Sequence, residues 1–231
     1  DDIRWDHAAD VVCVGSGAAA CSAAISAMVE GASVLLIEKM PVPGGTTARS
    51  GGVVWIPNNA LMRASGVEDK KEDCMRYMAR FAHSQNYSAD SPNLGLSESD
   101  YGLLESFYDN GSKMVDLIQE VGAVTFQEFR MWALDKPGLD YADHLPENKV
   151  PTGRAIEPAV STKSAEGGAT LAQRLEHYLR KKNVPILVSH RVKDIIKQGN
   201  RVVGVVTEHE GKLVNIKAHR AVIFGTGGYA H

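Results

Sequence analysis

Two short stretches of the sequence could bring a phosphate-bearing ligand close to the backbone. The first is GSGAAA at residues 15–20, which follows the apolar run of residues 11–14 and precedes an Ala-rich stretch. Gly15 permits a tight turn from a strand into a helix, and Gly17 has no Cβ to keep a pyrophosphate away. The first N–H groups of the helix can bind phosphate oxygens. We predict dinucleotide contacts at Gly15, Ser16, Gly17, Ala18 and Ala19.

The second stretch, AVIFGTGG at residues 221–228, has a similar form, because an apolar run leads directly into glycines. It is typical of a buried strand that ends in a turn closely approached by another group. We expect this turn and the turn at residues 15–17 to converge in space on one ligand.

A carboxylate completes the first motif. The apolar residues 34–37 predict a second strand, and Glu38 follows it at the distance where a carboxylate can accept hydrogen bonds from ribose hydroxyls. Glycine turns also occur in other α/β folds. The strand, helix, second strand and terminal acid in this order favour a dinucleotide site over that alternative.

A further glycine-rich segment follows at residues 44–52. Two glycine pairs bracket several hydroxyl side chains, and such dense glycines bring backbone N–H groups close to a flat or anionic ligand. A flexible loop without a ligand is the alternative, and spacing alone leaves both open. The residues concerned are Gly45, Thr46, Thr47, Ser50, Gly51 and Gly52.

Composition excludes several classes of protein. The net charge of −3 implies no basic face, so nucleic acid is not an expected partner, and no apolar run approaches the length needed to span a membrane. The three cysteines form no CxxC pair, so neither a disulfide framework nor a metal site is expected. Three buried thiols in a reducing, cytoplasmic compartment are the expectation.

The remaining pattern gives the elements that position these motifs. Helical spacing predicts helices at residues 69–83, from 97 onward and at 167–182, and residues 129–158 form a long loop. Strands are expected at 184–188, at 192–197, 202–207 and 213–218 as an antiparallel meander, and at 221–224 back in the main sheet. We assign residues 1–57 and 166–231 to a nucleotide-binding core, and residues 58–165 to a mostly helical insertion with a substrate-side loop.

Taken together, these motifs resemble the flavoprotein family of fumarate reductases and 3-ketosteroid dehydrogenases. The resemblance rests on GSGAAA, on Glu38-Lys39, on GGTTARSGGVVWIPNN at 44–59 and on the closing AVIFGTGGYAH; the SGGVVWIP form at 50–57 is closer to the ketosteroid branch. It implies an α/β, Rossmann-like FAD-binding domain with a central parallel sheet, an antiparallel meander and a helical insertion. In family members that bind FAD covalently, a histidine near the glycine-rich loop forms the bond. No histidine lies between His7 and His83 here, so FAD is expected to bind non-covalently. The further cofactor contacts implied are Lys39, Val192, Thr226, Gly227 and Gly228.

The resemblance also points to one catalytic side chain. Asp140-Tyr141, followed by Gly153-Arg154 and Pro158, matches a family segment whose tyrosine lines the steroid pocket and supports the tyrosine that acts as base. Tyr141 is therefore the predicted catalytic residue. The alternative is a packed aromatic ring whose hydroxyl meets a backbone carbonyl. Arg154 is expected either to form a surface ion pair with Glu157 or to orient the loop over the flavin.

The implied reaction is desaturation of a ketone of the 3-ketosteroid type, by proton abstraction and hydride transfer to flavin N5. The alternatives are a fumarate- or urocanate-type C=C reductase and a non-catalytic, FAD-holding electron-transfer subunit. In the family the FAD domain is discontinuous, so the fold is expected to be incomplete without a further segment. We expect either a natural split enzyme, in which a second polypeptide supplies the cap domain, the base and the closing FAD segment, or a cleaved fragment; a tightly associated second polypeptide is favoured. A hydrophobic ketone substrate and an electron acceptor are the other expected partners.

Overall fold

The structure, a computed structural model, describes residues 3–131, 135–159 and 167–228. The chain divides into two compact units: the first is Asp1–Gly52 with Gly122–Val124 and Ser164–His231, and the second is Val53–Val121 with Thr125–Lys163. The division falls after Gly52 and not after residue 57. The reason is that β3 (Val54–Trp55) pairs with β7 (Ala155–Pro158) inside the second unit.

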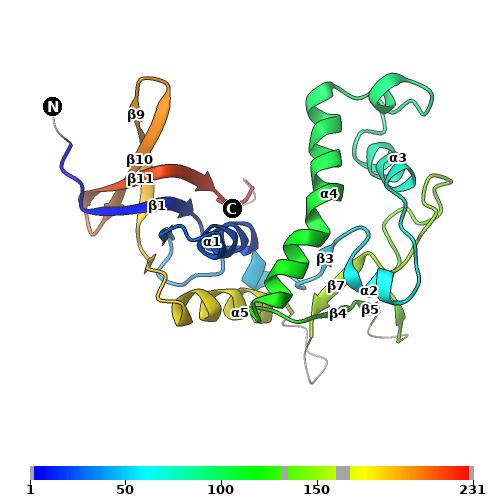
Figure 1. The fold of residues 1–231 in the computed structure, drawn as a ribbon, viewed down its shortest axis with the longest axis horizontal. Coiled ribbons are helices and arrows are strands. Elements are labelled where there is room, and N and C mark those ends of the chain that lie inside the picture. Colours follow the sequence, from blue (N-terminus) through cyan, green and yellow to red (C-terminus); the bar gives the residue numbers. More distant parts are fainter. Residues whose placement is uncertain (1–2, 132–134, 160–166, 229–231) are drawn as a thin grey trace. The chain divides into compact units, whose positions relative to one another are not determined.

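A six-stranded sheet forms the centre of the first unit, in the order β8-β2-β1-β11-β10-β9; Figure 1 labels β1, β11, β10 and β9 of this sheet. Its strands are β1 (His7–Val14), β2 (Val34–Ile37), β8 (Ile186–Leu187), β9 (Arg191–Gln198), β10 (Arg201–His209) and β11 (Lys212–Phe224). β8, β2, β1 and β11 are parallel to one another, whereas β10 is antiparallel to both β11 and β9. The predicted parallel sheet with an antiparallel meander is therefore confirmed.

Strand β11 corrects one prediction. The sequence predicted separate strands at 213–218 and 221–224, but a single strand runs from Lys212 to Phe224. The register with β1 moves from Ala9↔Ala218 to Val11↔Ala221, so two residues of β11 face one residue of β1. This is a bulge, and it accommodates the exposed polar residues 219–220 without ending the strand.

One helix of the first unit packs on its sheet, and a second helix packs on the first. α1 (Ala18–Val29) packs against β1 and β2 and also against α5 (Gly167–Lys181). The small residues Ala20 and Ala24 are fully buried in α1, which allows close helix–sheet packing. The strands contribute a hydrophobic cluster of Ala9, Val12, Val14, Leu35, Ile37, Val205, Ile216 and Ala218. This packing fixes the turn between β1 and α1, where the glycine motif lies.

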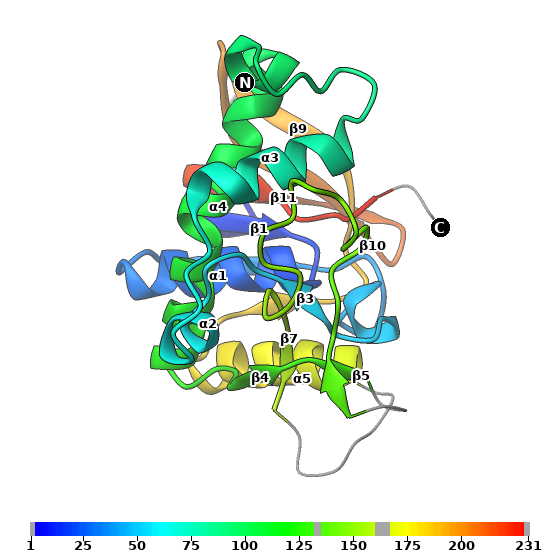
Figure 2. The same ribbon diagram turned by 90° about the vertical axis from the view of Figure 1, so that its right-hand side faces the viewer.

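The described residues of the second unit form the two predicted helices, a short helix that was not predicted and several short strand pairings. Its helices are α2 (Ala60–Ala64), α3 (Lys71–Ala82) and α4 (Glu98–Glu120), with a 3-10 turn at Pro92–Gly95. α3 packs against α4, as Figures 1 and 2 show, and α3 buries Cys74, Met75, Tyr77 and Met78 in the core of this unit. Ser97 caps α4, because its Oγ accepts a hydrogen bond of 3.1 Å from the N–H of Asp100.

The long segment after α4 is more ordered than its sequence indicated. Residues 129–158 were expected to form a loop, but β4 (Phe126–Glu128) and β3 both pair with β7, and β5 (Arg130–Met131) pairs with β6 (Lys136–Pro137). Strands of two to four residues carry too little periodicity to be recognised from sequence.

The three cysteines are free and buried, as expected. Burial raises the pKa of the Cys13 thiol to about 11 and the pKa values of Cys21 and Cys74 to about 12, so these thiols stay protonated and unreactive near neutral pH. Among the described residues, no helix is long and apolar enough to cross a membrane. The same residues contain no cluster of three or more side chains that could ligate a metal.

Candidate functional site

The two glycine turns meet at the carboxyl end of the parallel strands. Gly15 has a φ of +106°, and its N–H donates to the Ile37 carbonyl at 2.7 Å. Gly225 donates its N–H to the Val14 carbonyl at 2.8 Å. A Cβ at Gly15 would lie only 2.4 Å from the carbonyl oxygen of Gly225, so the two turns are in direct contact. The expected convergence of the two ends of the sequence is present.

Gly225 was not among the predicted site residues, although it precedes the Thr-Gly-Gly turn. A Cβ at Gly225 would lie 2.7 Å from the Cβ of Ala20, at the start of α1. The strand end and the helix therefore approach as closely as two small residues allow. This contact explains why the last position of the GSGAAA motif must be small.

A buried carboxylate links the first turn to the following loop. Glu38 is 5% exposed; its Oε1 accepts the N–H of Met40 at 2.8 Å, and its Oε2 accepts the Ser16 hydroxyl. The Ser16 oxygen in turn accepts the N–H of Gly44 at 2.9 Å. Ser16 thus connects two loops and does not present its hydroxyl outward. Each Glu38 oxygen keeps a lone pair for a further donor, while Lys39 is exposed.

The glycine-rich loop of residues 44–52 supports the start of α1. Thr47 begins a 3-10 turn (Thr47–Arg49), and its hydroxyl accepts the N–H of Ala18 at 3.0 Å. The first amide of α1 is therefore bonded within the protein. Ser50 is also used internally, because its Oγ donates to the Thr47 carbonyl at 2.8 Å and accepts from the N–H of Gly52 at 3.1 Å. Ala19 and Thr46 are exposed.

The glycines of this loop serve two different purposes. A Cβ at Gly52 would lie 2.2 Å from the carbonyl carbon of Gly167, so Gly52 is needed for packing against the start of α5. Gly45 and Gly51 are different, because a Cβ there would meet nothing within 4 Å. The same open space surrounds Gly227 and Gly228. These open positions, and not Gly52, are the ones where a ligand can approach the backbone.

Val192 lies in β9, opposite Thr207 of β10, and packs against the hydrophobic cluster of the sheet. The segment before it is tied to the end of β2. The N–H of His190 donates to the Glu38 carbonyl at 2.9 Å, and the N–H of Ser189 donates to the Met40 carbonyl at 3.0 Å. The structure therefore brings the approach to Val192 next to Glu38, although the two residues are far apart in the sequence.

Tyr141 belongs to the second unit and stands out by its exposure. Its side chain is 81% exposed, and its ring stacks on Phe81 with centroids 6.4 Å apart and an interplanar angle of 13°. Its backbone carbonyl accepts the hydroxyl of Tyr77. A packed aromatic ring, the alternative considered for this residue, does not fit such exposure.

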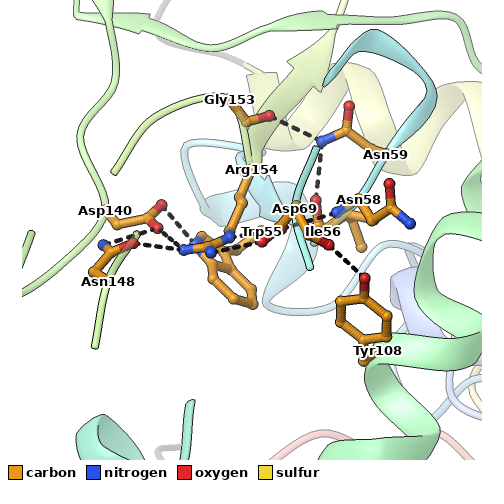
Figure 3. A network of polar contacts seen from close by, with 10 residues as sticks. All are labelled: Trp55, Ile56, Asn58, Asn59, Asp69, Tyr108, Asp140, Asn148, Gly153 and Arg154. Atoms are coloured by element: carbon orange, nitrogen blue, oxygen red, sulfur yellow. Dashed lines mark hydrogen bonds and ion pairs between the residues drawn. The ribbon is translucent and has the colours of Figure 1, made fainter. Parts of the chain in front are cut away.

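Next to Tyr141, a buried ion-pair network holds the loop in place (Figure 3). Arg154 has no solvent exposure, and it binds both oxygens of Asp69, through Nε at 2.8 Å and Nη2 at 2.7 Å. Its Nη1 binds Asp140 at 2.6 Å and Asn148 at 2.9 Å. The expected surface pair with Glu157 is wrong, because a buried guanidinium needs buried counter-charges and finds them in Asp69 and Asp140.

Further contacts surround this network. Trp55 donates Nε1–H to Asp140 at 2.8 Å, and the Arg154 guanidinium lies 5.3 Å from the Trp55 ring centroid and 5.2 Å from that of Tyr77. Burial by itself lowers the pKa of Arg154, but the hydrogen bonds with Asp69 and the charges of Asp69 and Asp140 outweigh it, and the pKa is raised. Arg154 is therefore permanently charged. The sequence signal for it was the Gly-Arg pair, which does not indicate its partners.

A family profile described as an FAD binding domain matches residues 10–231, nearly the whole chain. The chain belongs to this FAD-binding family. FAD is its cofactor, and non-covalent binding is consistent with the family.

Known relatives include both dehydrogenases and reductases. The chain is 27% identical to a 3-oxosteroid 1-dehydrogenase of Mycolicibacterium smegmatis, over 96% of this chain and 47% of the relative. It is 28% identical to an NADH:fumarate oxidoreductase of Klebsiella pneumoniae, over 96% of this chain and 20% of the relative. The 3-ketosteroid Δ1-dehydrogenase of Sterolibacterium denitrificans, solved with 1,4-androstadiene-3,17-dione, matches with a TM-score of 0.76 and 25% identity, over 96% of this chain and 48% of that one. The chain thus spans about half the length of the steroid dehydrogenases it matches.

The first unit fits the adenosine and phosphate parts of FAD on its own geometry. A ribose needs an acceptor, and Glu38 is a buried carboxylate with lone pairs to spare. A pyrophosphate needs backbone N–H groups; because the Ala18 N–H is bonded to Thr47, the turn at the start of α1 offers the backbone of Gly17 and of the exposed Ala19. The open faces of Gly45 and Gly51 add backbone that a flat ring can approach.

The substitution Glu38→Gln tests the ribose contact. The amide retains an acceptor for the Met40 N–H and can donate to Ser16, so the loop keeps its shape while the charge is lost. A hydrogen bond to a charged acceptor contributes about 1.5–3 kcal/mol, so the Kd for FAD should rise by about 10- to 100-fold. Flavin release during dialysis, followed by fluorescence, measures this. Glu30→Gln, at an exposed carboxylate after α1, is the control, and equal flavin retention in both variants contradicts the assignment.

The substitution Arg154→Met tests the network of the second unit. It leaves Asp69 and Asp140 buried without a counter-charge, which should lower the free energy of unfolding by about 3–5 kcal/mol. Arg76→Met removes a partly exposed ion pair with Glu72 and a hydrogen bond to the Ala89 carbonyl, and should cost about 1 kcal/mol. Urea unfolding of both variants provides the comparison. Similar small losses for the two variants would mean that the buried network does not stabilise this unit.

Proposed function

We propose that this chain is the FAD-binding part of a dehydrogenase that desaturates a ketone of the 3-ketosteroid type. Membership of the FAD-binding family makes it part of an FAD-dependent oxidoreductase; the ketone substrate is our proposal. The observation that carries it is the exposed Tyr141 hydroxyl on a backbone fixed by buried contacts on both sides. The similarity to 3-oxosteroid 1-dehydrogenases supports the same substrate class.

In this proposal the first unit holds FAD. Glu38 accepts hydrogen bonds from the ribose, the backbone around Val192 contacts the adenine, and the α1 turn binds the pyrophosphate. The side chains of Ser16 and Thr47 act indirectly, because they fix the loops. The remaining proposed contacts are Gly15, Gly17, Ala18, Ala19, Lys39, Gly45, Thr46, Ser50, Gly51, Thr226, Gly227 and Gly228. Gly52 acts indirectly, because it packs against the start of α5. When bound, the flavin supplies a hydride acceptor.

The second unit supplies the substrate-side group. Desaturation next to a ketone requires a base to remove the acidic proton beside the carbonyl while a hydride leaves the neighbouring carbon. A phenol hydroxyl such as that of Tyr141 can hydrogen-bond the base or the carbonyl oxygen. The exposed ring of Phe81 beside it offers an apolar surface for a hydrophobic ketone.

We further propose that another polypeptide segment, on this or a second chain, covers the flavin and contributes the base. Exposed apolar side chains near the two turns support this: Met40, Val42, Ile223 and Phe224 are all exposed. Exposed apolar residues at the ends of neighbouring strands fit a surface that another segment covers. A cytoplasmic location is also proposed, and the three free, buried thiols agree with a reducing compartment.

A second candidate function is reduction of a C=C bond beside a carboxylate. The similarity to the Klebsiella pneumoniae NADH:fumarate oxidoreductase, which covers 96% of this chain, favours it. The same FAD-binding unit would serve both reactions, and the substrate-side groups would differ.

Activity of the isolated flavoprotein separates these functions. A 3-ketosteroid should bleach the flavin without oxygen and should be turned over with an artificial electron acceptor, while fumarate with a reduced dye gives no turnover. Fumarate turnover alone would instead establish the reductase, and no response to either would leave an electron-transfer role. Denaturing mass spectrometry of the same sample identifies every polypeptide present.

The substitution Tyr141→Phe tests the proposed catalytic residue. Removing the hydroxyl should lower kcat with the ketone by about 10- to 100-fold, the size expected for loss of acid–base assistance, while flavin content stays unchanged. Tyr87→Phe, at a partly exposed tyrosine of the same unit, is the control. Steady-state kinetics of both variants measure the difference, and a kcat of Tyr141→Phe equal to that of the control excludes a catalytic role.

A further inference from the structure

Five aromatic side chains form a continuous row in the second unit. Phe107 of α4 stacks on Trp55 of β3 with centroids 6.2 Å apart, and Trp55 lies 6.0 Å from Tyr77 of α3. Tyr77 stacks on Phe81 at 6.2 Å, and Phe81 stacks on Tyr141 at 6.4 Å. The row runs from the buried Tyr77, which is 3% exposed, through the half-exposed Phe81 to the exposed Tyr141.

The backbone of Tyr141 is held on both sides. Its own carbonyl accepts the Tyr77 hydroxyl. The preceding residue, Asp140, is bound by Arg154, Trp55 and Asn148. After it, Ala142 has a φ of +51°, a left-handed conformation that non-glycine residues adopt only where their surroundings enforce it.

A fixed backbone and a fixed ring plane are unusual for an exposed residue such as Tyr141, which has no role in packing. A side chain that is mostly in solvent contributes little to stability, so fixing its backbone and its ring plane needs another reason. Groups that take part in chemistry must be held close to one geometry by neighbours whose own positions are locked by packing. Tyr77 is such a neighbour, because it is buried and contacts Tyr141 both through its hydroxyl and, by way of Phe81, through its ring.

We propose that Tyr77 is a positioning residue for Tyr141, fixing its backbone by a hydrogen bond and its ring plane through Phe81. This inference rests on the proposed function, in which Tyr141 acts on the substrate. Burial, followed by the nearby charge of Asp140, raises the pKa of Tyr77 to about 12. The hydroxyl therefore remains a donor throughout the pH range in which a base can act on a ketone.

Tyr108 provides a matched control within the same unit. Like Tyr77, it donates its hydroxyl to a backbone carbonyl, that of Asp69, and burial raises its pKa as well. Its bond holds the far side of the Arg154 network and does not touch Tyr141. Tyr77→Phe and Tyr108→Phe thus remove the same kind of hydrogen bond, and a merely structural effect would be similar in both.

The test uses ¹⁹F NMR of the flavin-loaded protein as isolated, with its tyrosines replaced by 3-fluorotyrosine. The resonance of residue 141 is the one that disappears in Tyr141→Phe. Tyr77→Phe should shift or broaden this ¹⁹F resonance and lower kcat by about tenfold with KM within about twofold, as expected for a misplaced group. Tyr108→Phe should leave the resonance in place and change kcat by less than about twofold. The proposal is overturned if the resonance of residue 141 is unchanged in Tyr77→Phe. It is also overturned if this resonance changes while kcat stays the same.

A second pair of variants guards against a general folding defect. Phe81→Leu removes the ring that stacks on Tyr141, and Phe107→Leu removes the ring at the other end of the row; both side chains are partly exposed. Only Phe81→Leu should alter the resonance of residue 141, and equal effects of the two variants contradict the proposal. The resonance does not depend on turnover. A protein that lacks ketone activity but shows these changes refutes the proposed function and leaves the positioning intact.

Discussion

A guanidinium without solvent contact lies between two buried carboxylates in the second unit, and the surrounding loops depend on it. Removing Arg154, Asp69 and Asp140 from water is costly, and their attraction offsets the cost only when the geometry is good and the remaining polar atoms are bonded. That condition is met here: Asp69 is bound at both oxygens, and Asp140 is bound by Arg154 and Trp55. Figure 3 shows how the segments around residues 55–59, 69, 140–148 and 153–154 meet at this one charge. The position of Tyr141 follows from this arrangement.

The first unit relies on the opposite kind of contact, in which side chains are absent. Gly15 and Gly225 let two turns touch, Ala20 lets α1 follow closely, and Gly52 lets a loop pack against α5. Other glycines of this unit, namely Gly45, Gly51, Gly227 and Gly228, have open space around them, so a ligand can approach the backbone there. The buried Arg154 network and the glycine turns therefore have different roles. The network fixes side chains in the second unit, and the glycines leave backbone exposed in the first unit.

Local pattern was sufficient to predict the fold and a dinucleotide site, whereas the choice of FAD came from the resemblance to the flavoprotein family. The apolar runs, the GSGAAA turn and the acid at residue 38 all act over short distances, and each is found in its expected element. The partners of Arg154 could not be predicted in this way, because Asp69 lies 85 residues away in the sequence, whereas Glu157 was the obvious neighbour. The bulge that makes β11 continuous was missed for a similar reason, since it depends on the register with β1. The roles of Gly52 and Ser16 were also invisible, because sequence cannot separate a glycine that faces a ligand from one that faces another backbone.

The continuity of β11 links two parts of the first unit that the sequence presents as separate. Its first half is a member of the meander, and its last residues lead into the Gly225 turn. A hairpin that was only attached to the sheet could open on its own. Here, opening of β9 and β10 would remove the hydrogen-bonded neighbour from one side of β11, the strand that leads into the Gly225 turn. The meander and the Gly225 turn should therefore exchange their amide hydrogens as one cooperative unit, and partial opening at β9 and β10 would loosen this turn, and with it the proposed nucleotide contacts, at a distance.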